Sequence, residues 1–304
     1  MVRRRRLSLR ARLARIGFRL FMKKSEADLS FDEIRQRFAR MERLTPRPPR
    51  GTRTTSVNAG GVPGLLVETA ASRPDRHLLY LHGGAYAFGS PQLYRHFTWR
   101  VANAARARVL IIDYRLAPEH PFPAALDDAV AAWRWLLDGG AQPAAMTMAG
   151  DSAGGGLALA AMLKLRDEGA ALPAAAAVMS PWTDLALTAA SFRDNAGSDP
   201  MMIAEDVPRF AAAYLGGTDA RNPYASPLYA DLRGLPPTMI QAGGDEILRD
   251  DAVRIAEKMR AAGCDVELQV WPAMPHTWQL LAPVLPEARE AIDEIARFFA
   301  QRLG

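Results

Sequence analysis

The sequence is poor in cysteine and has no long apolar run, and each absence excludes a class of protein. Cys264 is the single cysteine among 304 residues, so no disulfide forms within the chain and no pair of thiolates is available for a zinc site. No apolar stretch approaches the ~18 residues of a membrane-spanning helix. Arginines interrupt the N-terminal segment and no small-residue cleavage site follows it, which argues against a signal peptide. We therefore expect a cytoplasmic protein.

Acidic residues are absent before Glu26, whereas ten lysines and arginines precede it. Subtracting these ten from the 38 basic residues leaves 28 against 33 acidic ones, a net charge of −5 for the rest of the chain. The overall charge of +5 therefore belongs to the N-terminal segment. Because the body is acidic and carries no recognition motif, nucleic acid is not an expected partner.

The basic segment has the pattern of an amphipathic helix. Leu9, Leu13, Ile16 and Leu20 recur at helical spacing with arginines beside them. Two arrangements are open: packing of this apolar stripe on the body, which we favour, and contact with an anionic membrane surface. A second helical stretch, Phe31 to Leu44, ends at a proline-rich connection.

From about residue 51 short apolar runs alternate with helical patterns, which predicts a mostly parallel central sheet flanked by helices, an α/β fold. The predicted strands are Leu78–Leu81, Val109–Ile112, Met146–Ala149, Ala174–Met179, Met239–Ala242 and Val266–Trp271. The predicted helices are Tyr94–Ala105, Ala124–Asp138, Gly155–Glu168 and Asp250–Ala262. A stretch from Trp182 to about Leu235 breaks the alternation, and an insertion of this length favours a lid.

A G-x-S-x-G motif lies where a predicted strand meets a predicted helix. It runs from Gly150 to Gly154 with Ser152 at its centre. The serine of such a motif occupies a tight turn in which a side chain at either glycine would clash. The following helix N-terminus directs amide hydrogens toward the site where negative charge develops in acyl transfer. The motif predicts that Ser152 is a nucleophile.

A serine nucleophile needs a base and an orienting acid. Of the five histidines, only His276 follows Ser152, in agreement with the order serine, acid, histidine found in α/β-hydrolases. Asp245 follows a strand and a glycine pair, so we expect it to be the acid and expect Glu246 to point elsewhere. Asp250 and Asp251 begin the next helix, where carboxylates stabilise the N-terminus.

Consecutive glycines follow the strand Leu78–Leu81. In the run from His82 to Tyr86, Gly83 and Gly84 allow the backbone to approach a substrate oxygen closely. With the amide of Ala153, their amides are candidates for an oxyanion hole.

Together these motifs resemble those of the bacterial hormone-sensitive-lipase-like esterases, family IV of the α/β-hydrolases. The resemblance spans roughly residues 60 to 300 and rests on five segments: His82–Gly84, Asp113–Glu119, Gly150–Gly155, Asp245–Asp250 and Met274–His276. It implies a triad of Ser152, Asp245 and His276, with oxyanion donors at Gly83, Gly84 and Ala153. The sequence departs from many members at Ala85, where they carry a third glycine.

The resemblance also implies an α/β-hydrolase fold with a helical cap. The expected division is residues 1–50 and 182–235 for the cap and residues 51–181 and 236–304 for the catalytic core. The basic helix would then cover the substrate pocket. Five aromatic residues are candidates for the pocket, although core packing is the alternative that we favour for each. They are Tyr86, Trp182, Phe210, Tyr214 and Trp278.

The expected activity is hydrolysis of short- to medium-chain carboxylic esters, small molecules, through an acyl-enzyme, with no metal and no organic cofactor. A lactone hydrolase would use the same triad on a cyclic ester. A non-catalytic ligand-binding relative is a further alternative, but such proteins typically lose a triad member. The sequence leaves open whether the chain forms a homodimer.

Overall fold

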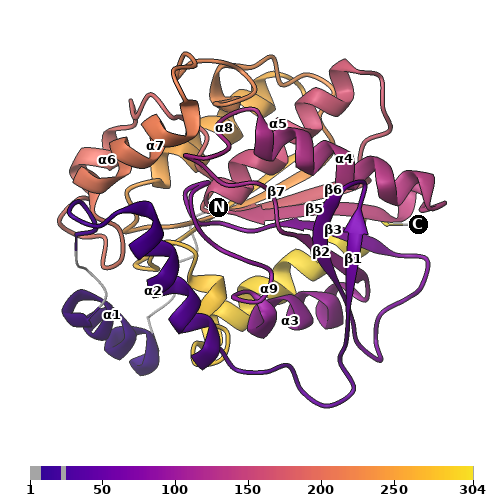
Figure 1. Ribbon diagram of the computed structural model, residues 1–304, viewed down its shortest axis with the longest axis horizontal. Coiled ribbons are helices and arrows are strands. Elements are labelled where there is room, and N and C mark those ends of the chain that lie inside the picture. The colour runs from indigo at the N-terminus through magenta and orange to yellow at the C-terminus, as the bar shows by residue number, and fades with distance from the viewer. Residues whose placement is uncertain (1–7, 22–24, 304) are drawn as a thin grey trace.

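The computed structural model describes residues 8–21 and 25–303 (Figure 1). Within these ranges eight strands form one sheet in the order β1-β2-β4-β3-β5-β6-β7-β8. Their bounds are β1 Arg53–Ala59, β2 Val62–Glu68, β3 His77–Leu81, β4 Arg108–Ile112, β5 Met146–Asp151, β6 Ala175–Met179, β7 Thr238–Gly243 and β8 Val266–Trp271. The last six of these strands match the predicted ones to within a few residues.

The sheet is parallel from β4 to β8, and its first two strands are antiparallel. Strands β1 and β2 form a hairpin around Gly60 and Gly61, whose positive φ angles of 68° and 94° close a two-residue turn. This hairpin is missing from the predicted strands. Strand β1 is mostly exposed and polar, so it lacks the apolar run that marked the others.

Helices cover both faces of the sheet, as Figure 1 shows, with α3 and α9 on one side and α4, α5 and α8 on the other. Side chains of the central strands alternate between two buried clusters: Leu79 and Leu81 join the first, and Leu78 and Tyr80 join the second. The bounds are α3 Arg95–Ala105, α4 Ala124–Asp138, α5 Ala153–Asp167, α8 Arg249–Ala261 and α9 Pro286–Ala300. The predicted α/β fold is confirmed.

The remaining helices lie to one side of the sheet, at the left in Figure 1. They are α1 Leu9–Phe21, α2 Phe31–Leu44, α6 Ala190–Asp194 and α7 Val207–Leu215. Short 3-10 helices are η1 Pro143–Ala145, η2 Ala204–Asp206, η3 Pro227–Tyr229 and η4 Trp278–Leu281. The N-terminal segment and the insertion contact each other. The rings of Phe31 and Phe210 meet edge to face at 5.7 Å, and Asp206 accepts hydrogen bonds from the Ser25 hydroxyl and the Glu26 amide.

Helix α1 contacts the body through the side opposite to its apolar stripe. The Ser8 amide donates to Glu287 of α9, and Ala11 is buried, whereas Leu9, Leu13 and Ile16 are 72%, 60% and 55% exposed. The prediction that the apolar stripe packs on the body is therefore wrong at these three positions. The side chains of Leu20, Arg15 and Arg19, and all of Arg3–Arg6 and Lys23–Lys24, lie outside the described residues. No helix in the described ranges is both long and apolar enough to cross a membrane.

Candidate active site

Ser152 lies in the turn that joins β5 to α5. Its φ of 53° and ψ of −125° are strained for a residue with a side chain, and the strain turns its hydroxyl out of the sheet. A Cβ at Gly150 would overlap the carbonyl oxygen of Gly154, and one at Gly154 would overlap that of Leu81. Both glycines of the motif are therefore required by close backbone contacts.

A continuous hydrogen-bonded chain links this serine to a buried carboxylate. His276 Nε2 lies 2.9 Å from Ser152 Oγ, and His276 Nδ1 lies 3.1 Å from Glu246 Oε2. His276 follows β8, and Glu246 follows β7, so both loops leave the carboxyl edge of the sheet on which Ser152 also lies. Glu246 is fully buried and His276 is nearly so. The arrangement has the geometry of a nucleophile, a base and an orienting acid.

The carboxylate in contact with His276 is that of Glu246, so the prediction of Asp245 for this position is wrong. The Asp245 side chain is partly exposed, whereas that of Glu246 turns into the interior. The backbone explains the difference: the Gly244 amide donates to the Trp271 carbonyl, and the Asp245 carbonyl accepts from the Ser198 hydroxyl. These bonds orient the turn so that the next residue, Glu246, points toward the histidine loop.

The insertion after β6 holds the loop that carries Glu246. Asn195 Nδ2 donates to the carbonyl oxygens of Gly244 and Glu246 at 3.3 and 2.9 Å. Asp199 accepts from the Ile247 amide at 3.0 Å. Asn195 and Asp199, which belong to the predicted lid, therefore hold the loop that carries Glu246.

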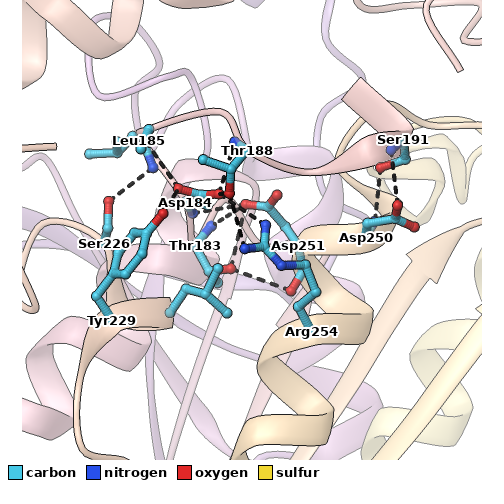
Figure 2. Close-up of polar contacts among 12 residues, drawn as sticks. Thr183, Asp184, Leu185, Thr188, Ser191, Ser226, Tyr229, Asp250, Asp251 and Arg254 are labelled. Atoms are coloured by element: carbon cyan, nitrogen blue, oxygen red, sulfur yellow. Dashed lines mark hydrogen bonds and ion pairs between the residues drawn. The ribbon is translucent and has the colours of Figure 1, made fainter. Parts of the chain in front are cut away.

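A second set of polar contacts joins the same insertion to the start of α8 (Figure 2). Asp251 accepts from the amides of Thr183 and Asp184 at 2.8 and 2.9 Å, and Arg254 pairs with Asp184 at 3.0 Å. Ser191 and Asp250 exchange two further bonds, visible at the right of Figure 2. The carboxylates of Asp250 and Asp251 therefore anchor the insertion, a role beyond the expected stabilisation of their own helix.

The surroundings of His276 shift its basicity. Burial alone would lower the pKa of His276, but the hydrogen bond and negative charge of Glu246 raise it, with smaller contributions from Asp199 and Asp151. The net pKa lies above the ordinary value for histidine. The raised pKa makes the imidazole a stronger base for removing the serine proton.

Gly83 does not offer its amide to a substrate in this structure, contrary to the prediction. Its N–H donates to the Tyr94 hydroxyl at 2.9 Å and to Asp151 Oδ1 at 3.1 Å. Asp151 also accepts from the hydroxyls of Tyr80 and Tyr94 at 2.7 and 2.8 Å. Burial raises the pKa of Asp151 to about 6, although these hydrogen bonds oppose the shift. Asp151, the motif residue before Ser152, thus holds the glycine loop in place.

The amides of Gly84 and Ala153 make no hydrogen bond within the described ranges. Ala153 is the first residue of α5, where backbone N–H groups lack intrahelical acceptors. Gly84 has φ of 120°, and a Cβ there would overlap the Phe88 carbonyl, so a glycine is required. These two amides are the remaining candidates for an oxyanion hole.

A cavity of about 520 Å³ opens at Ser152 and His276. Of the five aromatic candidates, Trp182 and Phe210 line it. The other three are packed elsewhere: the rings of Tyr86 and Tyr214 stack on each other at 3.6 Å, and Trp278 packs against Trp271 at 5.6 Å. The cavity has further apolar lining residues that were not predicted from the sequence. They are Phe38, Met41, Leu44, Phe88, Leu93, Met201, Met202, Ile203, Val207, Leu280 and Leu281.

These missed residues come from α2, the loop between β3 and α3, the insertion and the segment after β8. The apolar positions of α2 and the methionine pair in the insertion were the available signals, but neither distinguishes a cavity wall from core packing. The fold and the hydrogen-bonded chain together define a serine hydrolase of the α/β type, in which an activated hydroxyl attacks an acyl group at the carboxyl edge of a parallel sheet.

Comparisons with known proteins place the chain within this class. Residues 78–280 match the family model for the alpha/beta hydrolase fold. The chain is 49% identical over 234 residues to an acetyl-hydrolase from Streptomyces hygroscopicus, and the match covers 77% of this chain and 78% of that protein. It is 37% identical over 265 residues to the carboxylesterase/phospholipase LipF from Mycobacterium tuberculosis, covering 83% of this chain and 70% of that protein.

A solved structure agrees with these sequence matches. The crystal structure of an esterase from the bacterial hormone-sensitive lipase family superposes with a TM-score of 0.92 at 43% identity, covering 99% of this chain and 100% of that one. The chain belongs to the hormone-sensitive-lipase-like (family IV) esterases of the alpha/beta hydrolases. It is a serine carboxylesterase, a hydrolase of ester bonds.

Proposed function

We propose that the chain hydrolyses short- to medium-chain carboxylic esters with Ser152 as nucleophile, His276 as base and Glu246 as orienting acid. The observation that carries this proposal is the hydrogen-bonded chain from Glu246 through His276 to Ser152 at the floor of an apolar cavity. Asp245 has no place in this mechanism.

The reaction follows from the geometry. His276 Nε2 removes the proton of Ser152 as Oγ attacks the ester carbonyl, and the Glu246 carboxylate stabilises the imidazolium through Nδ1. The amides of Gly84 and Ala153 donate to the oxyanion of the tetrahedral intermediate. His276 then protonates the departing alcohol, and a water molecule, activated by the same imidazole, hydrolyses the acyl-enzyme.

The cavity supports the proposed range of acyl groups. A volume of about 520 Å³ is within the ordinary range for small-molecule sites, and it exceeds what an acetyl group alone requires. Its walls are mainly apolar, which favours the hydrocarbon part of an ester. Two relatives are named an acetyl-hydrolase and a carboxylesterase/phospholipase, which supports an ester as the substrate.

The domain division belongs to the same proposal. Residues 1–50 and 182–235 would form the cap, and residues 51–181 and 236–304 the catalytic core. Support comes from α2 and residues 201–210, which supply cavity-lining side chains above Ser152. A cytoplasmic location is also proposed, because the single Cys264 leaves the fold without need of an oxidising compartment.

A chain-length series of p-nitrophenyl esters, extended by lactones and run beside Ser152→Ala, tests the proposal. We expect turnover of acyl chains from two to about eight carbons and covalent labelling of Ser152 by a fluorophosphonate. A Ser152→Ala protein with full turnover would overturn the assigned nucleophile. Preference for lactones over every linear ester would overturn the assigned substrate class.

A further inference from the structure

Helix α1 presents an apolar face that the body does not cover. Leu9, Leu13 and Ile16 recur at positions i, i+4 and i+7, so they lie on one side of the helix. More than half of each of these side chains is exposed. Ala11, about half a turn away, is buried. The helix is therefore docked on the protein by its opposite side, and its apolar side faces outward.

Helix α1, held by the side opposite to this face, lies against the segment that borders the cavity. The Ser8 amide and hydroxyl both donate to Glu287, and Ala11 belongs to the same buried cluster as Leu285. A few residues earlier in that segment, Leu280 and Leu281 line the cavity. Leu44, which is 84% exposed, lines the cavity from α2. The exposed apolar side chains and the cavity thus share one region of the molecule.

The charged residues of α1 itself are all arginines. Arg10 and Arg12 are exposed and lie on either side of the apolar stripe on the helical wheel. Ten basic residues and no acidic one precede Glu26. A second copy of this chain would bring arginine against arginine if it packed on the same face. An anionic lipid surface instead offers hydrocarbon to the leucines and phosphate to the arginines.

We propose that α1 docks the protein on an anionic lipid surface, through Leu9, Leu13 and Ile16 in the acyl region and the flanking arginines at the headgroups. Docking in this position brings the cavity side of the molecule to the membrane, so esters dissolved in the lipid reach Ser152 without crossing bulk water. This delivery rests on the proposed ester hydrolysis, whereas docking itself does not.

Flotation of the full-length Ser152→Ala chain with vesicles tests docking without lipid turnover. We expect at least ten-fold stronger binding to vesicles of phosphatidylcholine with 30% phosphatidylglycerol than to phosphatidylcholine alone, because the basic flanks require anionic headgroups. Raising the salt to about 1 M should weaken this binding, since the Debye length falls to about 3 Å. Equal binding to both vesicles, or none to either, would overturn the proposal.

Two variants separate the apolar and the charged contributions. Leu9→Ser/Leu13→Ser/Ile16→Ser should reduce anionic-vesicle binding about ten-fold or more, with an unchanged melting temperature because these side chains are exposed. Arg10→Gln/Arg12→Gln should reduce it several-fold. The matched control is Arg134→Gln/Arg233→Gln, which removes the same charge from surface pairs away from α1 and should bind like the parent chain.

The remaining outcomes are equally decisive. If the triple serine variant binds like the parent, or if the control pair loses as much binding as Arg10→Gln/Arg12→Gln, docking through this face is refuted. If the parent is a dimer by sedimentation velocity and the triple serine variant is a monomer, a second copy covers the face and the lipid proposal is overturned. In a chain that retains Ser152, the triple serine variant should hydrolyse a soluble p-nitrophenyl ester at a rate within about two-fold of the parent rate. This measurement separates failed docking from failed catalysis.

Discussion

Replacement of Glu246 by glutamine tests the triad acid most directly. The side chain is fully buried and its Oε2 lies 3.1 Å from His276 Nδ1. An amide at this place loses the negative charge and can donate to Nδ1, which puts the proton on Nε2 and removes the acceptor that Ser152 needs. Loss of the orienting acid in a serine triad costs about 10³–10⁴ in kcat, or about 4.1–5.4 kcal/mol of transition-state stabilisation.

The pH profile gives a second readout with a definite sign. Glu246 holds the pKa of His276 above its ordinary value, and without that charge burial dominates and lowers it. Activity requires the neutral imidazole, so the acid limb of kcat/KM should move to lower pH in Glu246→Gln even as the plateau falls. The assay is p-nitrophenyl ester hydrolysis across pH 4 to 9, with melting temperature as a check on folding.

Asp245→Asn is the matched control, because it makes the same change one residue earlier. We expect it to retain kcat within about three-fold and to leave the acid limb in place. The reasoning is refuted if Asp245→Asn loses as much activity as Glu246→Gln, or if Glu246→Gln keeps more than about a tenth of the parent turnover.

Three further changes test the supports of the site. Because the folded-state pKa of Asp151 is raised from 3.8 to about 6, its contribution to stability is present below about pH 4 and lost as pH rises through about 6, a loss of about 3 kcal/mol. In denaturant unfolding measured at several pH values, Asp151→Asn should abolish this loss of unfolding free energy. The variant should also lower kcat about 10–100-fold, because it releases the Gly83 amide. Gly154→Ala should lower soluble yield or turnover more than 100-fold, because its Cβ would overlap the backbone at the end of β3, whereas Gly197→Ala, which has open space, should behave like the parent. Asn195→Ala removes two hydrogen bonds to the acid loop and should cost about 1–2 kcal/mol in unfolding free energy; unchanged stability and unchanged kcat would contradict the bracing role.

The core strands were predictable because burial on both faces leaves continuous apolar runs in the sequence. The same signal missed β1, whose residues from Arg53 to Asn58 are largely exposed. It also misjudged α1, since helical spacing identifies an apolar stripe but does not say which side of the helix meets the body. The stripe of Leu9, Leu13 and Ile16 faces outward because Ser8 and Ala11 provide the contacts.

At the active site, residues fixed by a local sequence pattern could be predicted, whereas residues positioned by long-range contacts could not. Gly150, Ser152 and Gly154 could be predicted because a tight turn imposes its residue types within five positions. The choice between Asp245 and Glu246 could not, since adjacent carboxylates are chemically alike and only the turn, braced by Asn195 and Ser198, directs one of them inward. The Gly83 amide is similarly engaged by Asp151 and Tyr94, which lie far from it in the chain.

The sequence by itself determined the six strands from β3 to β8, the serine turn and the one histidine that follows it, because these depend on burial and on steric limits within a few residues. Only the tertiary structure decided which carboxylate reaches that histidine, which amides stay free for an oxyanion, and which aromatic side chains line the cavity rather than the core. These depend on segments that are far apart in the chain and meet at one edge of the sheet; Ser152 and His276, for example, are separated by 124 residues.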